Sequence, residues 1–163
     1  MNPAQKTDFT TLSLRKILET KRPRIASLQA AADELRQMGR YRWVGLYDVD
    51  HANGMVKNTV WSGRGAPEYP TFPIGKGLTS VAISTLKTIN VGDVASDPRY
   101  LTAFGNTRSE IIIPVLDAKG QTVVGTIDIE SESSNAFSAD TQAMLETVAE
   151  ILRPMWQSLN RTD

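Results

Sequence analysis

Two hairpins, each made of two apolar segments around a short turn, restrict the fold of this chain more than any other feature. The first turn contains Asn53-Gly54, a dipeptide that strongly favours a hairpin, and the second covers 117–120. Strands joined by short turns run antiparallel, so the sequence predicts an antiparallel sheet rather than a doubly wound parallel one. The four predicted strands cover 41–49, 55–62, 110–116 and 122–131.

Helical periodicity appears on both sides of these hairpins. Apolar residues from 24 to 38 recur at spacings of three and four, which predicts an amphipathic helix ending at Gly39. Ser138 is the predicted N-cap of a last helix, in which Pro154 should introduce a kink. An earlier helical piece is expected over 11–20. Helices from both ends of the chain can cover one face of the sheet, which makes the predicted fold class α+β.

The stretch between the two hairpins is rich in loops. We expect a loop over 63–73, a short helix over 78–85, a short strand over 89–91 and mostly loop over 93–108. Because the terminal helices cover one face of the sheet, this middle segment should lie over the other face.

Composition limits the size and the chemistry. The 163 residues suit one domain, predicted at 24–159 between a partly helical N-terminal arm (1–23) and a tail (160–163). The formal net charge of zero argues against nucleic-acid binding through bulk positive charge. With no cysteine and one histidine, His51, the chain cannot use thiolates or histidine clusters. No apolar run resembles a signal peptide or a membrane span, so we expect a cytoplasmic protein without a membrane partner.

Aromatic and acidic side chains alternate along two of the predicted strands. Trp43 and Tyr47 share one strand face, Asp128 and Glu130 share another, and Glu110 opens the neighbouring strand. Carboxylates gathered in a partly dry cavity must either take up a proton or hold a cation. An ammonium group suits such a place, and the aromatic rings would add a cation–π attraction of about 0.5–2 kcal/mol. We therefore predict a small amino-bearing ligand. The alternatives are a solvated acidic sheet face or, less favoured, a hard metal ion.

Other candidate sites carry weaker signals. Gly75-Lys76-Gly77 precedes a predicted helix, as in phosphate-binding loops, but it lacks the spacing of a Walker A motif. His51 lies beside a turn, where solvation explains it. Ser109 and Ser131 have no histidine partner that could make either of them a nucleophile.

Four segments together resemble a GAF domain, and most of all its free methionine-(R)-sulfoxide reductase branch. They are Arg42-Trp43-Val44-Gly45-Leu46-Tyr47, Pro73-Ile74-Gly75-Lys76-Gly77, Ser109-Glu110-Ile111 and Gly125-Thr126-Ile127-Asp128-Ile129-Glu130. The resemblance implies a central antiparallel sheet with terminal helices on one face and a loop-roofed ligand pocket on the other. It also implies that Trp43, Tyr47, Glu110, Asp128 and Glu130 bind the ligand, although the family usually has Asp at the last position.

The reductase branch uses loop cysteines, at positions that correspond here to Tyr69, Thr79 and Ala103, the last in place of the attacking thiol. Sulfoxide reduction by that route needs sulfur, which this chain lacks. The resemblance therefore predicts a non-catalytic sensor domain for a metabolite such as methionine sulfoxide or a related amino acid. It requires no cofactor and no catalytic residue. The alternatives are a homodimer formed through the terminal helices with a vestigial pocket, and a residual reductase-like enzyme.

Overall fold

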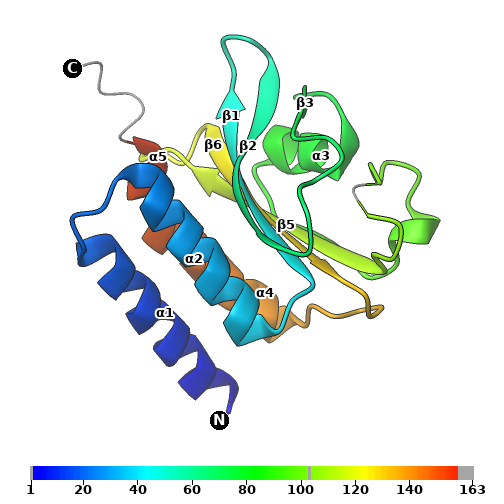
Figure 1. Ribbon diagram of the computed structural model, residues 1–163. Coiled ribbons are helices and arrows are strands. Elements are labelled where there is room, and N and C mark those ends of the chain that lie inside the picture. Colours follow the sequence, from blue (N-terminus) through cyan, green and yellow to red (C-terminus); the bar gives the residue numbers. More distant parts are fainter. Residues whose placement is uncertain (1, 103, 158–163) are drawn as a thin grey trace.

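The computed structural model describes residues 2–102 and 104–157, which form one layered α+β domain (Figure 1). Six antiparallel strands make a single sheet in the order β3-β2-β1-β6-β5-β4. The strands are β1 (Trp43–Asp50), β2 (Met55–Gly63), β3 (Thr71–Pro73), β4 (Ile89–Val91), β5 (Ser109–Leu116) and β6 (Val123–Ser131). The predicted fold class and both hairpins are therefore confirmed.

Two long helices cover one face of the sheet with a third packed outside them, whereas a short helix and loops lie over the other face (Figure 1). The long helices are α1 (Pro3–Glu19), α2 (Arg24–Gly39) and α4 (Ala139–Leu152), and the short helix is α3 (Gly77–Thr85). Alternate side chains of the central strands point toward the long helices and are fully buried there. This core includes Val44, Leu46, Ile111, Ile113, Ile127 and Ile129 from the sheet, with Leu28, Leu35, Leu145 and Leu152 from the helices.

Strand register sets which residues face each other on the opposite side of the sheet. Trp43 of β1 pairs with Glu130 of β6, and Glu130 pairs in turn with Glu110 of β5. One row further along, Asp128 pairs with Gly45 of β1. The register thus brings aromatic and acidic residues from three strands together before any loop is considered.

The start of one helix and the C-cap of another differ from the prediction, for local reasons. Helix α1 begins at Pro3, well before residue 11, because Asn2 caps it through reciprocal hydrogen bonds with Gln5. Helix α2 includes Gly39, and it is Arg40 that takes the left-handed conformation, with φ of 53°. Gly39 instead makes room for the ring of Tyr41, because a Cβ there would lie 1.9 Å from a ring atom.

One further segment corrects the expected pattern, and another confirms it. Strand β3 lies within the segment expected to be a loop, and it pairs with β2 at the sheet edge, where Pro73 costs no ladder hydrogen bond. As expected, Pro154 interrupts the last helix, and a short α5 (Pro154–Gln157) follows α4. Helix α1 packs against α2 and α4. Within residues 2–102 and 104–157, no helix is both long and apolar enough to cross a bilayer.

Candidate functional site

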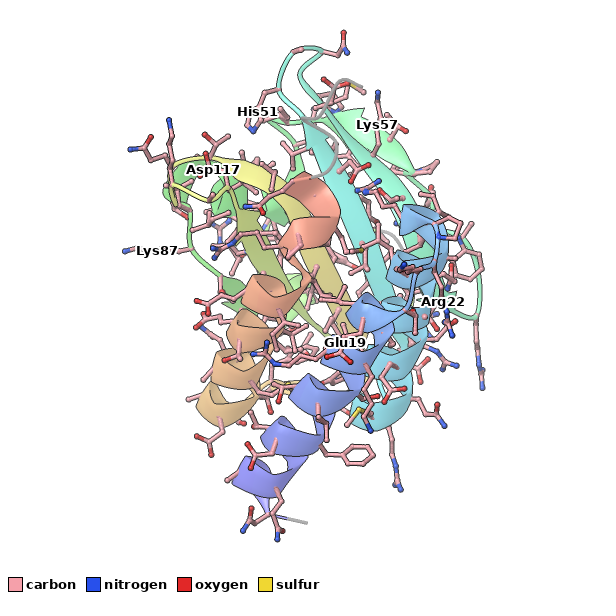
Figure 2. The ribbon with its side chains drawn as sticks, turned by 90° about the vertical axis from the view of Figure 1, so that its left-hand side faces the viewer. Glu19, Arg22, His51, Lys57, Lys87 and Asp117 are labelled. Carbon is pink, nitrogen blue, oxygen red and sulfur yellow. The ribbon has the colours of Figure 1, made fainter. Side chains whose placement is uncertain are left out.

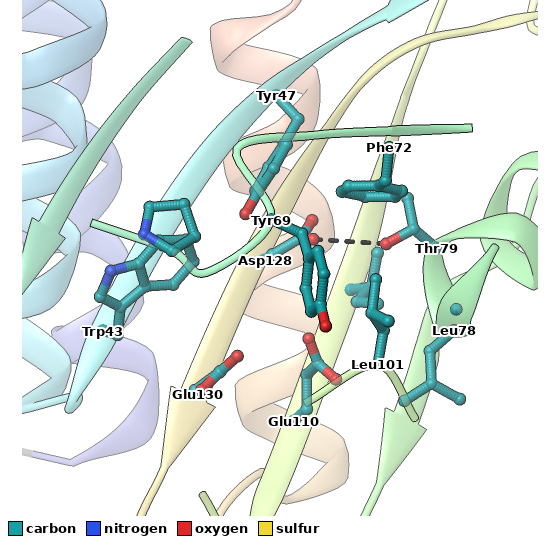
Figure 3. Close-up of a pocket in the computed structure, with 13 residues that line it drawn as sticks. Trp43, Tyr47, Tyr69, Phe72, Leu78, Thr79, Leu101, Glu110, Asp128 and Glu130 are labelled. Carbon is teal, nitrogen blue, oxygen red and sulfur yellow. Dashed lines mark hydrogen bonds between the residues drawn. The ribbon is translucent and has the colours of Figure 1, made fainter. Parts of the chain in front are cut away.

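The five residues proposed as ligand contacts all line one cavity between the sheet and its loops (Figure 3). Trp43 and Tyr47 come from β1, Asp128 and Glu130 from β6, and Glu110 from β5. They share a sheet face because strand side chains alternate with a period of two. Ligand binding itself stays a prediction.

The cavity is small in this structure. Its volume is about 30 Å³, which is room for about one or two water molecules. Loop residues cover it, and Figure 3 shows the Tyr69 ring directed inward with its hydroxyl toward Glu110. The remaining lining residues are Pro67, Phe72, Gly77, Leu78, Thr79, Leu101 and Ile112.

The three acids are almost completely buried. Glu110, Asp128 and Glu130 expose 8%, 5% and 2% of their surface, respectively. The Thr107 hydroxyl donates a hydrogen bond to Glu130 Oε2, and Thr79 Oγ1 makes a long one, 3.5 Å, to Asp128 Oδ2. Asp128 Oδ1 is buried without a hydrogen-bond partner of normal geometry among the described residues. The cavity therefore holds an unused acceptor, which costs free energy until a donor or a proton meets it.

Burial controls the protonation of these acids. It raises the pKa of Asp128 to about 7, a shift that the Thr126 hydroxyl opposes and Glu130 increases. Burial likewise raises the pKa of Glu130 to about 7, against the hydrogen bond from Thr107 and the positive charge of Arg42. The pKa of Glu110 rises well above its ordinary value through burial and repulsion from the other two carboxyls. At neutral pH, the carboxyls of the empty site are therefore partly protonated.

Aromatic rings lie beside the acids in the wall of the cavity. Trp43 packs against Phe104 with ring centroids 5.4 Å apart, and Tyr47 meets Phe72 edge-on at 5.9 Å. Trp43 Nε1 donates to the Gly65 carbonyl at 3.1 Å, which ties the loop after β2 to the sheet. Gly45 lets the two rings of β1 converge, because a Cβ there would lie 2.1 Å from the Trp43 ring.

The chemistry of the lining favours a cation. It contains three carboxylic acids and no lysine or arginine. A ligand with an ammonium group would displace protons from these carboxyls, satisfy Asp128 Oδ1 and lie beside aromatic faces. No group of three or more acidic or histidine side chains within residues 2–102 and 104–157 is arranged to hold a metal ion.

Sequence reasoning missed part of the roof, whereas the weaker candidates behave as expected. Tyr69, Phe72 and Leu101 carry no periodic signal because they lie in loops or on a three-residue strand. The Gly75-Lys76-Gly77 turn contributes Gly77 to the wall of this cavity. His51 is exposed near the β1–β2 turn, where a ring nitrogen lies 2.7 Å from the Val123 carbonyl (Figure 2). Ala103 lies outside the described residues.

The chain is therefore an α+β domain with an antiparallel sheet, helices on one face of the sheet, and an acidic and aromatic pocket under loops on the other face. A family model described as "GAF domain" matches residues 23–153, and the chain belongs to the GAF family.

Its relatives include free methionine-R-sulfoxide reductases. The one from Saccharomyces cerevisiae is 30% identical over 112 residues, which cover 68% of this chain and 60% of that protein. The type II enzyme from Thermoplasma acidophilum shares 32% identity with a TM-score of 0.77, covering 89% of this chain and 96% of that one. The enzyme from Neisseria meningitidis, solved with its substrate, shares 25% identity with a TM-score of 0.87, covering 97% and 92%. This chain contains no cysteine.

Proposed function

We propose that this GAF domain binds a small amino-bearing metabolite in the acidic cavity and does not transform it. The observation that carries the proposal is the cluster of three buried carboxyls, one with an unpartnered oxygen, facing two aromatic rings. Free methionine sulfoxide, methionine or a related amino acid is the leading ligand, because relatives of similar fold are named for free methionine-R-sulfoxide.

The missing cysteines support binding without turnover. Thiol-dependent sulfoxide reduction requires one sulfur to accept the oxygen and another thiol to resolve the intermediate. Tyr69 and Thr79, at two positions assigned to those cysteines, both line the cavity, but a hydroxyl cannot replace a thiolate in that chemistry.

A ligand of this size requires the roof to move. The cavity has room for only about one or two waters, so an amino acid can enter only if part of the cover moves. Tyr69 is the candidate, because its ring is directed inward. Tyr69 is already 42% exposed, and its ring can swing outward without unfolding the sheet beneath it.

Calorimetry with L-methionine sulfoxide and L-methionine tests the proposed binding. The double variant Asp128→Asn/Glu130→Gln should weaken binding at least about a hundredfold, because each charged hydrogen bond accounts for about tenfold or more in affinity. The matched control Glu19→Gln/Glu150→Gln removes two exposed carboxylates away from the cavity and should bind like the wild type (Figure 2 shows Glu19). Equal affinity in both double variants would reject the site.

An activity assay tests the absence of turnover separately. With L-methionine-(R)-sulfoxide and dithiothreitol as reductant, we expect no methionine formation above that in protein-free buffer. Turnover that Asp128→Asn/Glu130→Gln abolishes would show an enzyme that does not depend on cysteine.

Exposed apolar residues on the first two helices favour a second candidate function, homodimer formation. Phe9 and Leu12 of α1 and Ile25 of α2 are each more than half exposed. Pairing of these helix faces between two copies would bury them. Light scattering should then give a dimer for the wild type and a monomer for Phe9→Glu/Leu12→Glu. A monomeric wild type would exclude this assembly.

A further inference from the structure

A second hollow, outside the acidic cavity, is lined by four arginines. Arg36 and Arg40 lie at the C-terminal end of α2, Arg42 immediately precedes β1, and Arg64 immediately follows β2. The end of β6 and the residues after it complete the wall with Ser131, Glu132 and Ser133. This arginine hollow has a volume of about 320 Å³, roughly ten times that of the acidic cavity.

Positive charge in the arginine hollow exceeds the negative charge nearby. Glu132 binds Arg42, with 3.1 Å between Oε1 and Nε, and it also accepts a hydrogen bond from Asn106. Asp33 lines an adjacent hollow and accepts a hydrogen bond from Gln29, and the buried Glu130 interacts with the charge of Arg42. In the part of the chain that the structure describes, Arg36, Arg40 and Arg64 form no ion pair.

The protein holds several of these arginines in place. Arg42 lies over the Phe104 ring, 4.5 Å from its centroid, and its Nη1 atom is buried without a hydrogen-bond partner among the described residues. Arg36 Nε donates to Ser62 Oγ at 2.9 Å. Arg40 takes the left-handed conformation directly after α2, where the Tyr41 ring packs against Gly39. Such preorganisation reduces the entropy that a ligand must overcome.

The helix dipole explains only part of the cluster. Cations are favourable at a helix C-terminus, which accounts for Arg36 and Arg40. Arg42 and Arg64 come from the ends of strands, where no such field exists. Guanidinium groups are planar and donate two parallel hydrogen bonds, a geometry that suits phosphate oxygens better than lysine does.

We propose that the arginine hollow binds a small phosphate-bearing ligand. Two features favour a small ligand over a nucleic-acid strand: the charge is confined to one concave place, and the chain as a whole has no net charge. This hollow is separate from the acidic cavity, although the charge of Arg42 also acts on Glu130.

Calorimetry with inorganic pyrophosphate at constant ionic strength tests this proposal. We expect saturable binding of one pyrophosphate per chain. The variant Arg40→Asn/Arg64→Gln should weaken that binding about tenfold or more for each arginine removed. Both side chains are exposed, and asparagine tolerates the left-handed conformation at position 40, so the fold should persist.

The matched control Arg22→Gln/Lys87→Gln removes two exposed cations from other parts of the surface (Figure 2) and should keep the affinity of the wild type. Three outcomes would overturn the proposal. The wild type could show no saturable binding, or the control pair could lose as much affinity as the test pair. A single-stranded RNA could also bind more tightly than pyrophosphate and lose affinity in Arg40→Asn/Arg64→Gln, which would identify a nucleic-acid surface.

Discussion

At the scale of single residues, the acidic cavity is built from carboxyl groups whose ionised form is disfavoured by burial. Asp128 and Glu130 come from a strand whose other face carries Ile127 and Ile129 into the core. Their burial therefore follows from the same alternation that stabilises the domain. Protonation relieves the cost of burying them, so stability and ligand binding should respond to pH in opposite directions.

Stability of the unliganded protein should fall as pH rises. The pKa of Asp128 is about 7 in the folded chain against an ordinary value of 3.8, so the native state holds more protons than the unfolded state between these values. The stabilisation is complete below about pH 4, and the free energy of unfolding should drop by a few kcal/mol as pH rises through about 7. Asp128→Asn removes this contribution. In urea unfolding, the free energy of unfolding of the variant should therefore fall less between pH 5 and pH 8 than that of the wild type. Parallel pH dependence in the two proteins would contradict it.

Affinity for an amine should rise over the same pH range. An ammonium group binds the ionised carboxyls, whereas the empty cavity is largely protonated below the raised pKa values of Asp128 and Glu130, both about 7. Binding therefore releases protons. Calorimetry of L-methionine at pH 6 and pH 8, in buffers of different ionisation enthalpy, should show tighter binding and less proton release at pH 8. Binding that does not depend on pH would mean that the ammonium group does not contact these acids.

At the scale of elements, helix α5 connects the C-terminal end of α4 to the strand that forms the pocket. Trp156 Nε1 donates to the Tyr47 carbonyl at 3.0 Å, and the Trp156 ring lies on Gly125 of β6. Arg24 of α2 donates to the Met155 carbonyl and pairs with Asp48 of β1. The short helix is thus fixed to the sheet from two sides.

Replacing Gly125 tests this attachment. A Cβ at Gly125 would lie 2.0 Å from Trp156 Nε1, so Gly125→Ala must displace a buried ring. Overpacking of this kind costs about 1–3 kcal/mol, measurable by urea unfolding. Gly75→Ala is the matched control, because no atom lies within 4 Å of its added Cβ, and it should change stability by less than about 0.5 kcal/mol. If Gly125→Ala lost no more stability than Gly75→Ala, the Trp156 ring would be able to move away without a measurable cost in free energy.

At the scale of the whole molecule, local patterns in the sequence predicted the layers but not the contacts between them. Turn chemistry and strand alternation gave both hairpins, the face of Trp43 and Tyr47, and the face of Asp128 and Glu130. Register is a property of two strands together, so the direct opposition of Glu110 and Glu130 could not be derived from either strand alone. A loop roof was implied by the family resemblance, but its contacts could not be derived, because loop residues such as Tyr69 follow no period.

The Tyr69 ring covers the acidic cavity and should control how fast a ligand enters it. Tyr69 directs its ring into the cavity, and the space that remains is too small for an amino acid. If the departure of this ring limits ligand entry, Tyr69→Ala should accelerate the association of L-methionine sulfoxide at least about tenfold. Stopped-flow tryptophan fluorescence can follow the reaction, because Trp43 lines the same cavity.

Tyr69→Phe keeps the ring and removes only the hydroxyl, so it should associate at the rate of the wild type if bulk is what closes the site. Rapid association in Tyr69→Phe as well would instead locate the barrier in the hydroxyl, which points toward Glu110. A Tyr69→Ala rate no faster than that of the wild type would show that another part of the roof opens first. Because the tyrosine is partly exposed, neither substitution removes a side chain from the helix-side core, and a difference in rate would report the opening itself.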